Sequence, residues 1–312
     1  MDQLRRGYLY ALGAYLCWGF FPIYFKALRP AAPVEILAHR VIWSSLFVAI
    51  LLTLAVRWRS VAALVRRPRV FGGICLAAAL IAVNWGIYIY GVNSDHVVET
   101  SLGYFINPLV SVLFGLFVFG ERLRRVQWAA LSIGTVAVVV LTVDYGRLPW
   151  IALSLAVTFG SYGLIKKRLG VPPADGLFIE SSVLAIPAVG YLAWLTERGQ
   201  STFGHVSTTH AVLLAISGVL TAIPLLLFAS AANRIPLTSI GVLQYVTPTL
   251  QLMCGVLLYH EPMPPARLLG FGLVWLALAV FTWDALRYGR RAARAARADA
   301  VEVVDAGLQV AR

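Results

Sequence analysis

The chain has 312 residues, of which 60% are hydrophobic and 13% are charged, and its mean hydropathy is +0.79. Soluble globular domains carry about a quarter charged residues, so this composition excludes an ordinary water-soluble enzyme. The net charge of +12 does not indicate a nucleic-acid-binding protein, because the basic residues lie in short clusters between apolar runs.

Ten apolar runs of roughly 17 to 23 residues follow one another, each about long enough to cross a hydrocarbon core of about 30 Å. In chain order, the predicted spans are 7–25, 36–56, 70–92, 97–120, 126–143, 149–165, 176–195, 211–232, 237–258 and 268–286. The connections between them are short and leave no room for a soluble domain. We therefore predict an all-α membrane protein with ten transmembrane helices embedded in a lipid bilayer.

The basic residues of the loops are distributed unevenly between the two sides that this topology defines. With the N-terminus placed in the cytoplasm, the loops of the opposite side contain only Lys26, Arg29, Arg147, Arg198 and Arg267. Cytoplasmic loops of membrane proteins are enriched in Lys and Arg. The distribution therefore predicts that the N-terminus and the C-terminus are both cytoplasmic.

The second half of the chain repeats the first at a shift of 140 residues. Residues of special backbone or charge recur at this shift as the pairs Pro108–Pro248, Gly115–Gly255 and Glu121–Glu261. Because each half has an odd number of spans, the second half enters the membrane from the opposite side, which gives inverted repeats. We predict five-helix repeats at 1–146 and 147–286, followed by a basic cytoplasmic tail at 287–312. This tail either lies on anionic lipid headgroups or is a solvated topology anchor.

Several motifs carry a resemblance to a known family. They are Cys17 to Pro22, then Glu35, His39, Arg40 and Trp43, the pair Asn84 and Trp85, Glu99 to Pro108, Gly120 and Glu121, and the late Gln244, Tyr245, Pro248, Glu261 and Pro262. With them the chain resembles the RarD branch of the EamA family, in the drug/metabolite transporter (DMT) superfamily, over nearly its whole length. The resemblance implies ten helices in two inverted halves, a central cavity and a permease role in a bacterial inner membrane. It supplies no substrate.

Prolines and polar or aromatic side chains of the spans are the candidates for a substrate site. A proline removes a backbone donor, and the freed groups need protein or a water-filled cavity, so we predict helix breaks at Pro22, Pro108 and Pro248. The candidate substrate-binding residues are Trp18, Asn84, Trp85, Tyr88, Tyr104, Asn107, Gln244 and Thr247. Hydrogen bonds between helices explain the amides equally well, and aromatic residues near span ends also serve as interfacial anchors.

Ionisable residues inside the spans are functional candidates because charge is costly in a bilayer. They form a candidate coupling or charged cluster of Glu35, His39, Arg40, Glu99 and Glu180. The carboxylates lie about one turn from a span end, so a packing role and proton coupling both remain open. Arg40 stays charged, so it binds either an anionic substrate group or one of these carboxylates.

The remaining classes of function have characteristic sequence motifs. The sequence contains no GxxxxGK[ST], HExxH or GxSxG motif, and Cys17, Cys75 and Cys254 lie inside apolar runs without a metal-binding spacing. We therefore predict no enzyme activity, cofactor or metal. The predicted function is secondary-active export of a small polar or amphipathic metabolite or drug by alternating access, with protons as a candidate coupling ion. The alternative is a membrane-embedded sensor or scaffold without net flux.

Overall fold

The computed structural model describes residues 3–119, 123–232, 234–235, 237–284 and 286–287, and within them every regular element is a helix. Gly120, Glu121 and nearly all of the tail lie outside these residues. The helices are α1 (Gln3–Gly19), α2 (Phe21–Ala27), α3 (Pro33–Leu54), α4 (Trp58–Val65), α5 (Pro68–Asn93), α6 (Val97–Phe119), α7 (Arg125–Tyr145), α8 (Trp150–Leu169), α9 (Pro173–Glu197), α10 (Thr208–Ala232), α11 (Leu237–Leu243), α12 (Val246–Met253), the π-helix η1 (Cys254–Leu258) and Pro265–Asp284.

Helix occupies each of the ten predicted apolar runs, and in the described residues eight helices are long and apolar enough to cross a membrane. The shorter apolar helices Trp150–Lys166 and Val246–Leu258 lie where the sixth and ninth spans are predicted. The first span is interrupted at Phe20, between α1 and α2, and the ninth between α11 and α12. The short helix α4 lies in the connection between the second and third predicted spans.

The prolines differ in their effect on the helices. Pro22 and Pro248 lie in the first turns of α2 and α12, where a missing N–H group costs no intrahelical bond. Pro108, in contrast, lies inside the continuous α6. The predicted break at Pro108 is therefore wrong. The neighbouring Phe105 and Leu109 are buried in the largest core cluster, and this packing holds the turn together.

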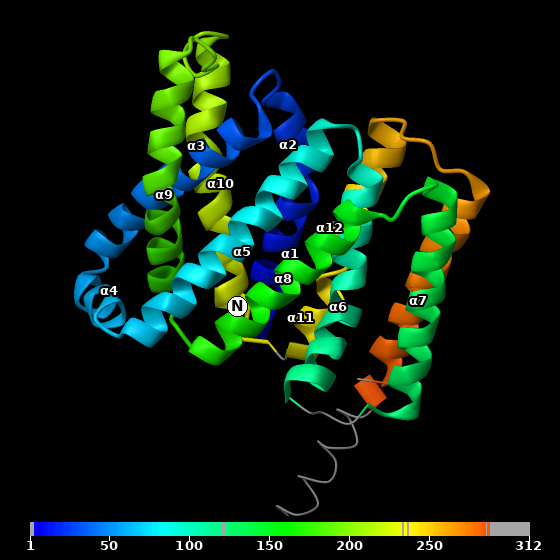
Figure 1. The fold of residues 1–312 in the computed structure, drawn as a ribbon. Coiled ribbons are helices and arrows are strands. Elements are labelled where there is room, and N and C mark those ends of the chain that lie inside the picture. The colour runs from blue at the N-terminus through cyan, green and yellow to red at the C-terminus, as the bar shows by residue number, and fades with distance from the viewer. Residues whose placement is uncertain (1–2, 120–122, 233, 236, 285, 288–312) are drawn as a thin grey trace, which may run out of the picture.

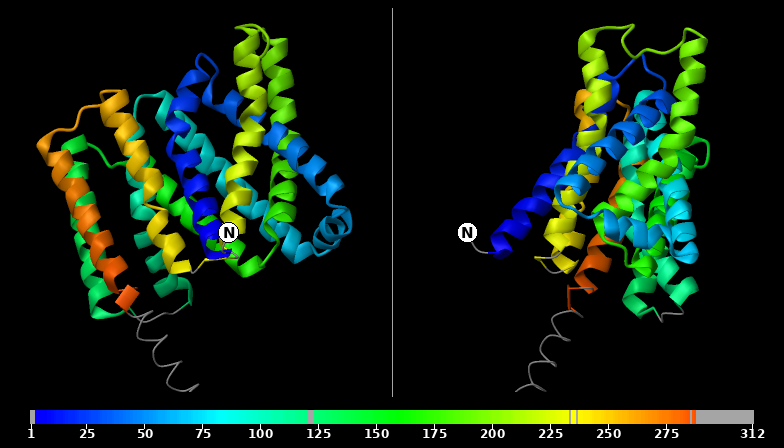
Figure 2. Two further views of the ribbon diagram at one scale, coloured as in Figure 1. Left: turned by 180° about the vertical axis from the view of Figure 1, so that it is seen from behind. Right: turned by 90° about the vertical axis from the view of Figure 1, so that its left-hand side faces the viewer.

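The helices form two packed groups joined by a central set (Figure 1). In one group α3 packs against α9 and α10. In the other, α7 packs against Pro265–Asp284, where Gly270 lies against Leu141. Helices α1, α5, α6, α8 and α12 contact one another between these groups. The start of α1 and the end of Pro265–Asp284 lie at the same end of the bundle (Figure 2).

The backbones of α3 and α10 approach each other closely near the centre of the molecule, at Gly218. A Cβ atom added to Gly218 of α10 would lie 2.2 Å from the carbonyl carbon of Trp43 on α3. Only glycine permits this contact, which brings α10 of the second half directly onto α3 of the first. Arg40, one turn before Trp43, is thereby placed beside the side chains of α10.

Candidate substrate site

The two interrupted spans lie against each other. Gly19, the last residue of α1, faces Leu250 of α12 so closely that an added Cβ would lie 2.6 Å from the leucine Cδ1. α2 also contacts η1, so the two broken spans touch on both sides of their breaks. This contact joins the first half of the chain to the second.

Side chains of α12 satisfy the backbone that the break in the first span opens. Pro22 has no N–H group, so the carbonyl oxygen of Trp18, four residues earlier, loses its usual donor. The side-chain amide of Gln251 donates to that oxygen at 3.1 Å. The hydroxyl of Thr247 donates to the carbonyl of Tyr15 at 2.9 Å. Thr247, a candidate substrate residue, therefore forms a hydrogen bond between helices.

Arg40 lies beside the break, buried to 4% exposure on α3. Its Nε donates to Thr221 Oγ1 at 2.7 Å. The Thr221 hydroxyl in turn donates to the carbonyl of Ser217 at 2.8 Å, which leaves its oxygen to accept from the arginine. The guanidinium carbon lies 4.2 Å from the centre of the Trp85 ring. Arg40 is thus held between α10 on one edge and α5 on one face.

Aromatic rings surround this guanidinium group. The rings of Phe21 and Phe25 lie 5.4 and 5.5 Å from its carbon atom. Tyr88 packs edge-on against Phe25 at 5.9 Å and against Tyr104 at 5.6 Å. The Tyr88 hydroxyl is buried and has no hydrogen-bond partner in the described part of the chain. We call Arg40 and the rings around it, Phe21, Phe25, Trp85, Tyr88 and Tyr104, the central site.

Three other predicted substrate residues, Trp18, Gln244 and Asn107, lie on α1, at the break of the ninth span and on α6. The Trp18 ring packs at 5.8 Å from Tyr15 and 5.9 Å from Phe228, on the side of α1 that faces α10. Gln244 lies between α11 and α12, at the break of the ninth span. Asn107, on α6, faces Gly160 of α8. None of these has a contact with Arg40 among the described interactions.

Asn84 serves the packing of α5 on α8. Its buried amide donates to the carbonyl of Leu155 at 3.0 Å and to Thr158 Oγ1 at 2.9 Å. Its side-chain oxygen accepts a longer hydrogen bond, at 3.4 Å, from the Tyr104 hydroxyl. Both amide hydrogens are thus bound within the protein. The hydrogen bond with Tyr104 connects Asn84 to the central site.

Glu35 and His39, which share a helix with Arg40, face a different part of the molecule. The Glu35 carboxylate accepts the backbone N–H of Thr202 at 2.7 Å. The His39 ring stacks on Phe203 with 4.7 Å between ring centres, and both line a cavity of about 290 Å³ between α3 and α9. These two residues therefore hold the connection between α9 and α10.

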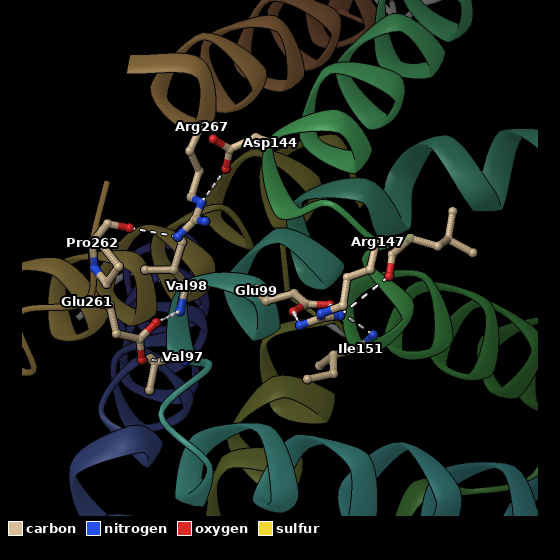
Figure 3. Close-up of polar contacts among 10 residues, drawn as sticks. Val97, Val98, Glu99, Asp144, Arg147, Ile151, Glu261, Pro262 and Arg267 are labelled. Atoms are coloured by element: carbon tan, nitrogen blue, oxygen red, sulfur yellow. Dashed lines mark hydrogen bonds and ion pairs between the residues drawn. The ribbon is translucent and has the colours of Figure 1, made fainter. Parts of the chain in front are cut away.

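The predicted charged cluster is divided between separate sites. Glu180 is buried and accepts from Lys166 at 2.6 Å and from the Tyr162 hydroxyl at 3.1 Å. Glu99 is also buried and accepts from Arg147 at 2.7 Å (Figure 3). Each carboxylate thus has its own cation, and neither reaches Arg40.

A second polar group lies at one end of the bundle, around the start of α6 (Figure 3). The Glu261 carboxylate accepts the backbone N–H groups of Val97 and Val98 at 2.6 and 2.8 Å. Arg267 forms an ion pair with Asp144 at 2.9 Å. Both contacts join the second half of the chain to the first at this end of the bundle.

Glu261 and Arg267 line a cavity of about 260 Å³ together with Asp95, His96 and Glu99. Burial raises the pKa of Glu261, against the opposing effect of its two backbone donors. The hydrogen bond from Lys26 lowers the pKa of Asp95. The cavity therefore combines fixed cations with carboxylates of differing proton affinity.

Sequence reasoning missed Thr221 and Arg147 as parts of these sites. A threonine in an apolar span gives no signal by itself, because its hydroxyl can bond its own helix. The spacing of Gln244, Thr247 and Gln251 predicts one polar helix face, but the structure places Gln244 at the break and only Thr247 and Gln251 on α12. Pro22 indicates that the carbonyl group of Trp18, the partner of Gln251, lacks its backbone donor. Arg147 lies in a short loop and could be paired only after α7 and α8 are placed.

The chain is similar to known proteins in sequence and in fold. A family model described as the EamA-like transporter family matches residues 5–143 and again residues 148–283. Protein RarD of Streptomyces exfoliatus is 52% identical over 290 residues, which cover 93% of this chain and 92% of that protein. An uncharacterized transporter of Vibrio cholerae is 40% identical over 294 residues, covering 94% and 97%. A solved crystal structure with 20% identity and a TM-score of 0.57 covers 90% of this chain and 98% of its own, which shows a shared fold.

Proposed function

The chain belongs to the EamA-like transporter family, in the branch of the proteins called RarD, and we propose that it exports a small polar or amphipathic metabolite or drug. The proposed mechanism is alternating access of two inverted five-helix halves, driven by a gradient of the substrate or of protons. The sequence has no phosphate-binding loop for ATP, which favours a gradient as the energy source. The proposed location is a bacterial inner membrane with both termini in the cytoplasm.

The packing pattern supports the inverted repeat. If the two halves are exchanged span for span, the contact of α1 with α10 becomes that of α8 with α5. The contact of α6 with α8 becomes that of α12 with α1, and the contact of α3 with α10 becomes that of α9 with α5. All these pairs occur, as do the pairs α3 with α9 and α6 with α12, which map onto themselves. The double match of the family model supports the same division.

The observation that carries the proposal is the contact of the two broken spans between the halves. In many secondary transporters, substrate sites are formed by discontinuous helices near the repeat interface. Here α1 and α2 meet α12 and η1 at such an interface, with Arg40 and aromatic rings beside the break. A sensor or scaffold has no need of two broken helices that contact each other at this point.

Flux in reconstituted vesicles tests the proposal. Proteoliposomes loaded with a mixture of bacterial metabolites should release at least one solute faster than protein-free liposomes, as measured by mass spectrometry. If no solute crosses, the protein is a sensor or scaffold and the proposal is wrong.

A matched pair of variants tests the role of the break. Gly19→Ala places a methyl group against Leu250, whereas Gly13→Ala on the same helix meets only an ordinary contact at 3.6 Å. Gly19→Ala should slow release while Gly13→Ala leaves it unchanged. Equal release by the two variants would exclude movement at this contact.

A further inference from the structure

Arg40 is a buried cation without a carboxylate partner in the part of the chain that the structure describes. The ion pairs found there join other residues, namely Lys26 and Arg29 with Asp95, Arg57 with Asp175, Arg124 with Asp284, Arg147 with Glu99, Lys166 with Glu180, and Arg267 with Asp144. Glu35 and Glu261 accept backbone N–H groups instead. Arginine stays protonated, and a buried charge without a counter-charge is costly. The central site is therefore prepared for an anion.

The surroundings of Arg40 select the shape of that anion. Thr221 holds the Nε edge at 2.7 Å, and Trp85 covers one face at 4.2 Å. The remaining edge of the guanidinium group matches the two oxygens of a carboxylate. The buried Tyr88 hydroxyl, which has no partner among the described residues, is a further donor. Phe21 and Phe25 supply apolar ring faces.

The central site also discriminates between charge types. In the described part of the chain, the titratable groups that act on Arg40 are Tyr24, Tyr88, Tyr104 and Cys17, and no carboxylate is among them. The ammonium group of an amino acid would thus find no acidic partner. A monoanion with an apolar body fits better than a zwitterion or a cation.

We infer that the central site binds a small carboxylate with a flat, apolar ring, through Arg40 and the Tyr88 hydroxyl, and that such anions are the substrate class. The claim that such anions are the substrate class rests on the proposed transport function. The claim that the central site binds them concerns binding alone and is tested separately.

The test uses benzoate and indole-3-acetate as probes on the purified full chain in detergent. Both should raise the melting temperature, because a ligand that binds the folded state stabilises it. The neutral benzamide and indole-3-acetamide, and zwitterionic phenylalanine, should not. Arg40→Gln should weaken probe binding about 10- to 100-fold, as expected for lost hydrogen bonds to a charged group.

A second pair of variants guards against misfolding of Arg40→Gln. Tyr88→Phe removes only an unpartnered hydroxyl, so the protein should fold as the wild type and bind benzoate about 10-fold more weakly. Tyr145→Phe is the matched control, because its hydroxyl is also buried without a described partner but lies at the end of α7. It should bind benzoate normally.

Each outcome decides the inference. No stabilisation by either anion, equal stabilisation by the amides, or normal binding by Tyr88→Phe would overturn it. Vesicle flux of neutral or cationic solutes without anion binding would leave the transport function standing and this inference refuted. Anion binding without flux of any solute would confirm the binding site and refute the proposed transport function.

Discussion

A double-mutant cycle can test the role of the hydrogen bond from Gln251 to the carbonyl oxygen of Trp18. Pro22 has no N–H group to donate to this oxygen, and the side chain of Gln251 supplies the missing donor. Gln251→Leu removes the donor at nearly constant side-chain volume. Pro22→Ala restores a backbone N–H that can bond the same carbonyl within a straightened first span.

Two opposing effects set the size of the change. Loss of the donor leaves a buried carbonyl unsatisfied, which costs about 1–3 kcal/mol. Gln251 also buries a side-chain oxygen with no described partner, and its removal offsets part of that cost. The single variant alone is thus a weak test, with a net loss of about 1 kcal/mol expected. The coupling with Pro22→Ala is sharper, because hydrogen bonds between membrane helices measure about 0.6 and at most about 1.7 kcal/mol in such cycles.

The free energy of unfolding can be measured by titration with sodium dodecyl sulfate in mixed micelles. Gln251→Leu should destabilise the wild type more than it destabilises Pro22→Ala, by about 0.6–1.7 kcal/mol. Gln244→Leu, at the break of the same span, is the control and should show no coupling to position 22. Additive effects of Gln251→Leu and Pro22→Ala would refute the idea that the glutamine replaces the missing proline donor.

Further predictions concern packing, pH and orientation. Gly218→Ala should destabilise the protein by about 3 kcal/mol or more, because its methyl group would meet the backbone of α3 at 2.2 Å. Gly163→Ala, which has open space around it, should change the free energy of unfolding by less than about 1 kcal/mol in the same titration. Burial raises the pKa of Glu261, so its contribution to stability is full below the ordinary value of 4.5 and is lost as the pH rises through the raised pKa. The melting temperature of the wild type relative to Glu261→Gln should therefore increase as the pH falls from about 8 to about 5, and a constant difference would contradict this assignment. A cysteine at exposed Ala32 should react with an impermeant maleimide on intact cells and one at exposed Ala62 should not; the opposite result would invert the proposed orientation.

Hydropathy predicted where the helices lie, because the length of a membrane span is fixed by the bilayer. It did not predict where a span breaks. A proline marks a missing donor, but Pro108 lies in a continuous helix whose neighbours are packed, while Pro22 lies just after a real break. The difference depends on tertiary partners, in particular on Gln251, which is distant in sequence.

In the candidate site, too, the sequence predicts some features and only the structure shows the others. Arg40 could be found from the sequence because an arginine inside a span is costly and rare. The sequence does not predict the partners of Glu99 and Glu180. Arg147 and Lys166 lie in two predicted loops, one on each side of the membrane. The structure pairs both carboxylates with these cations. Among the described residues, the buried charge of Arg40 is left without a carboxylate partner, which only the assembled helices could reveal.

The position of Arg40 also suggests how a bound anion would act on the two halves. Its side chain belongs to the first half, as does Trp85, while Thr221 belongs to the second. A ligand can shift a conformational equilibrium only by the difference in its affinity for the two states. An anion at Arg40 would have that difference if separation of α3 from α10 removed the Thr221 bond that aims the guanidinium group. In the proposed mechanism, the contact between the halves and the substrate site are therefore one structural element.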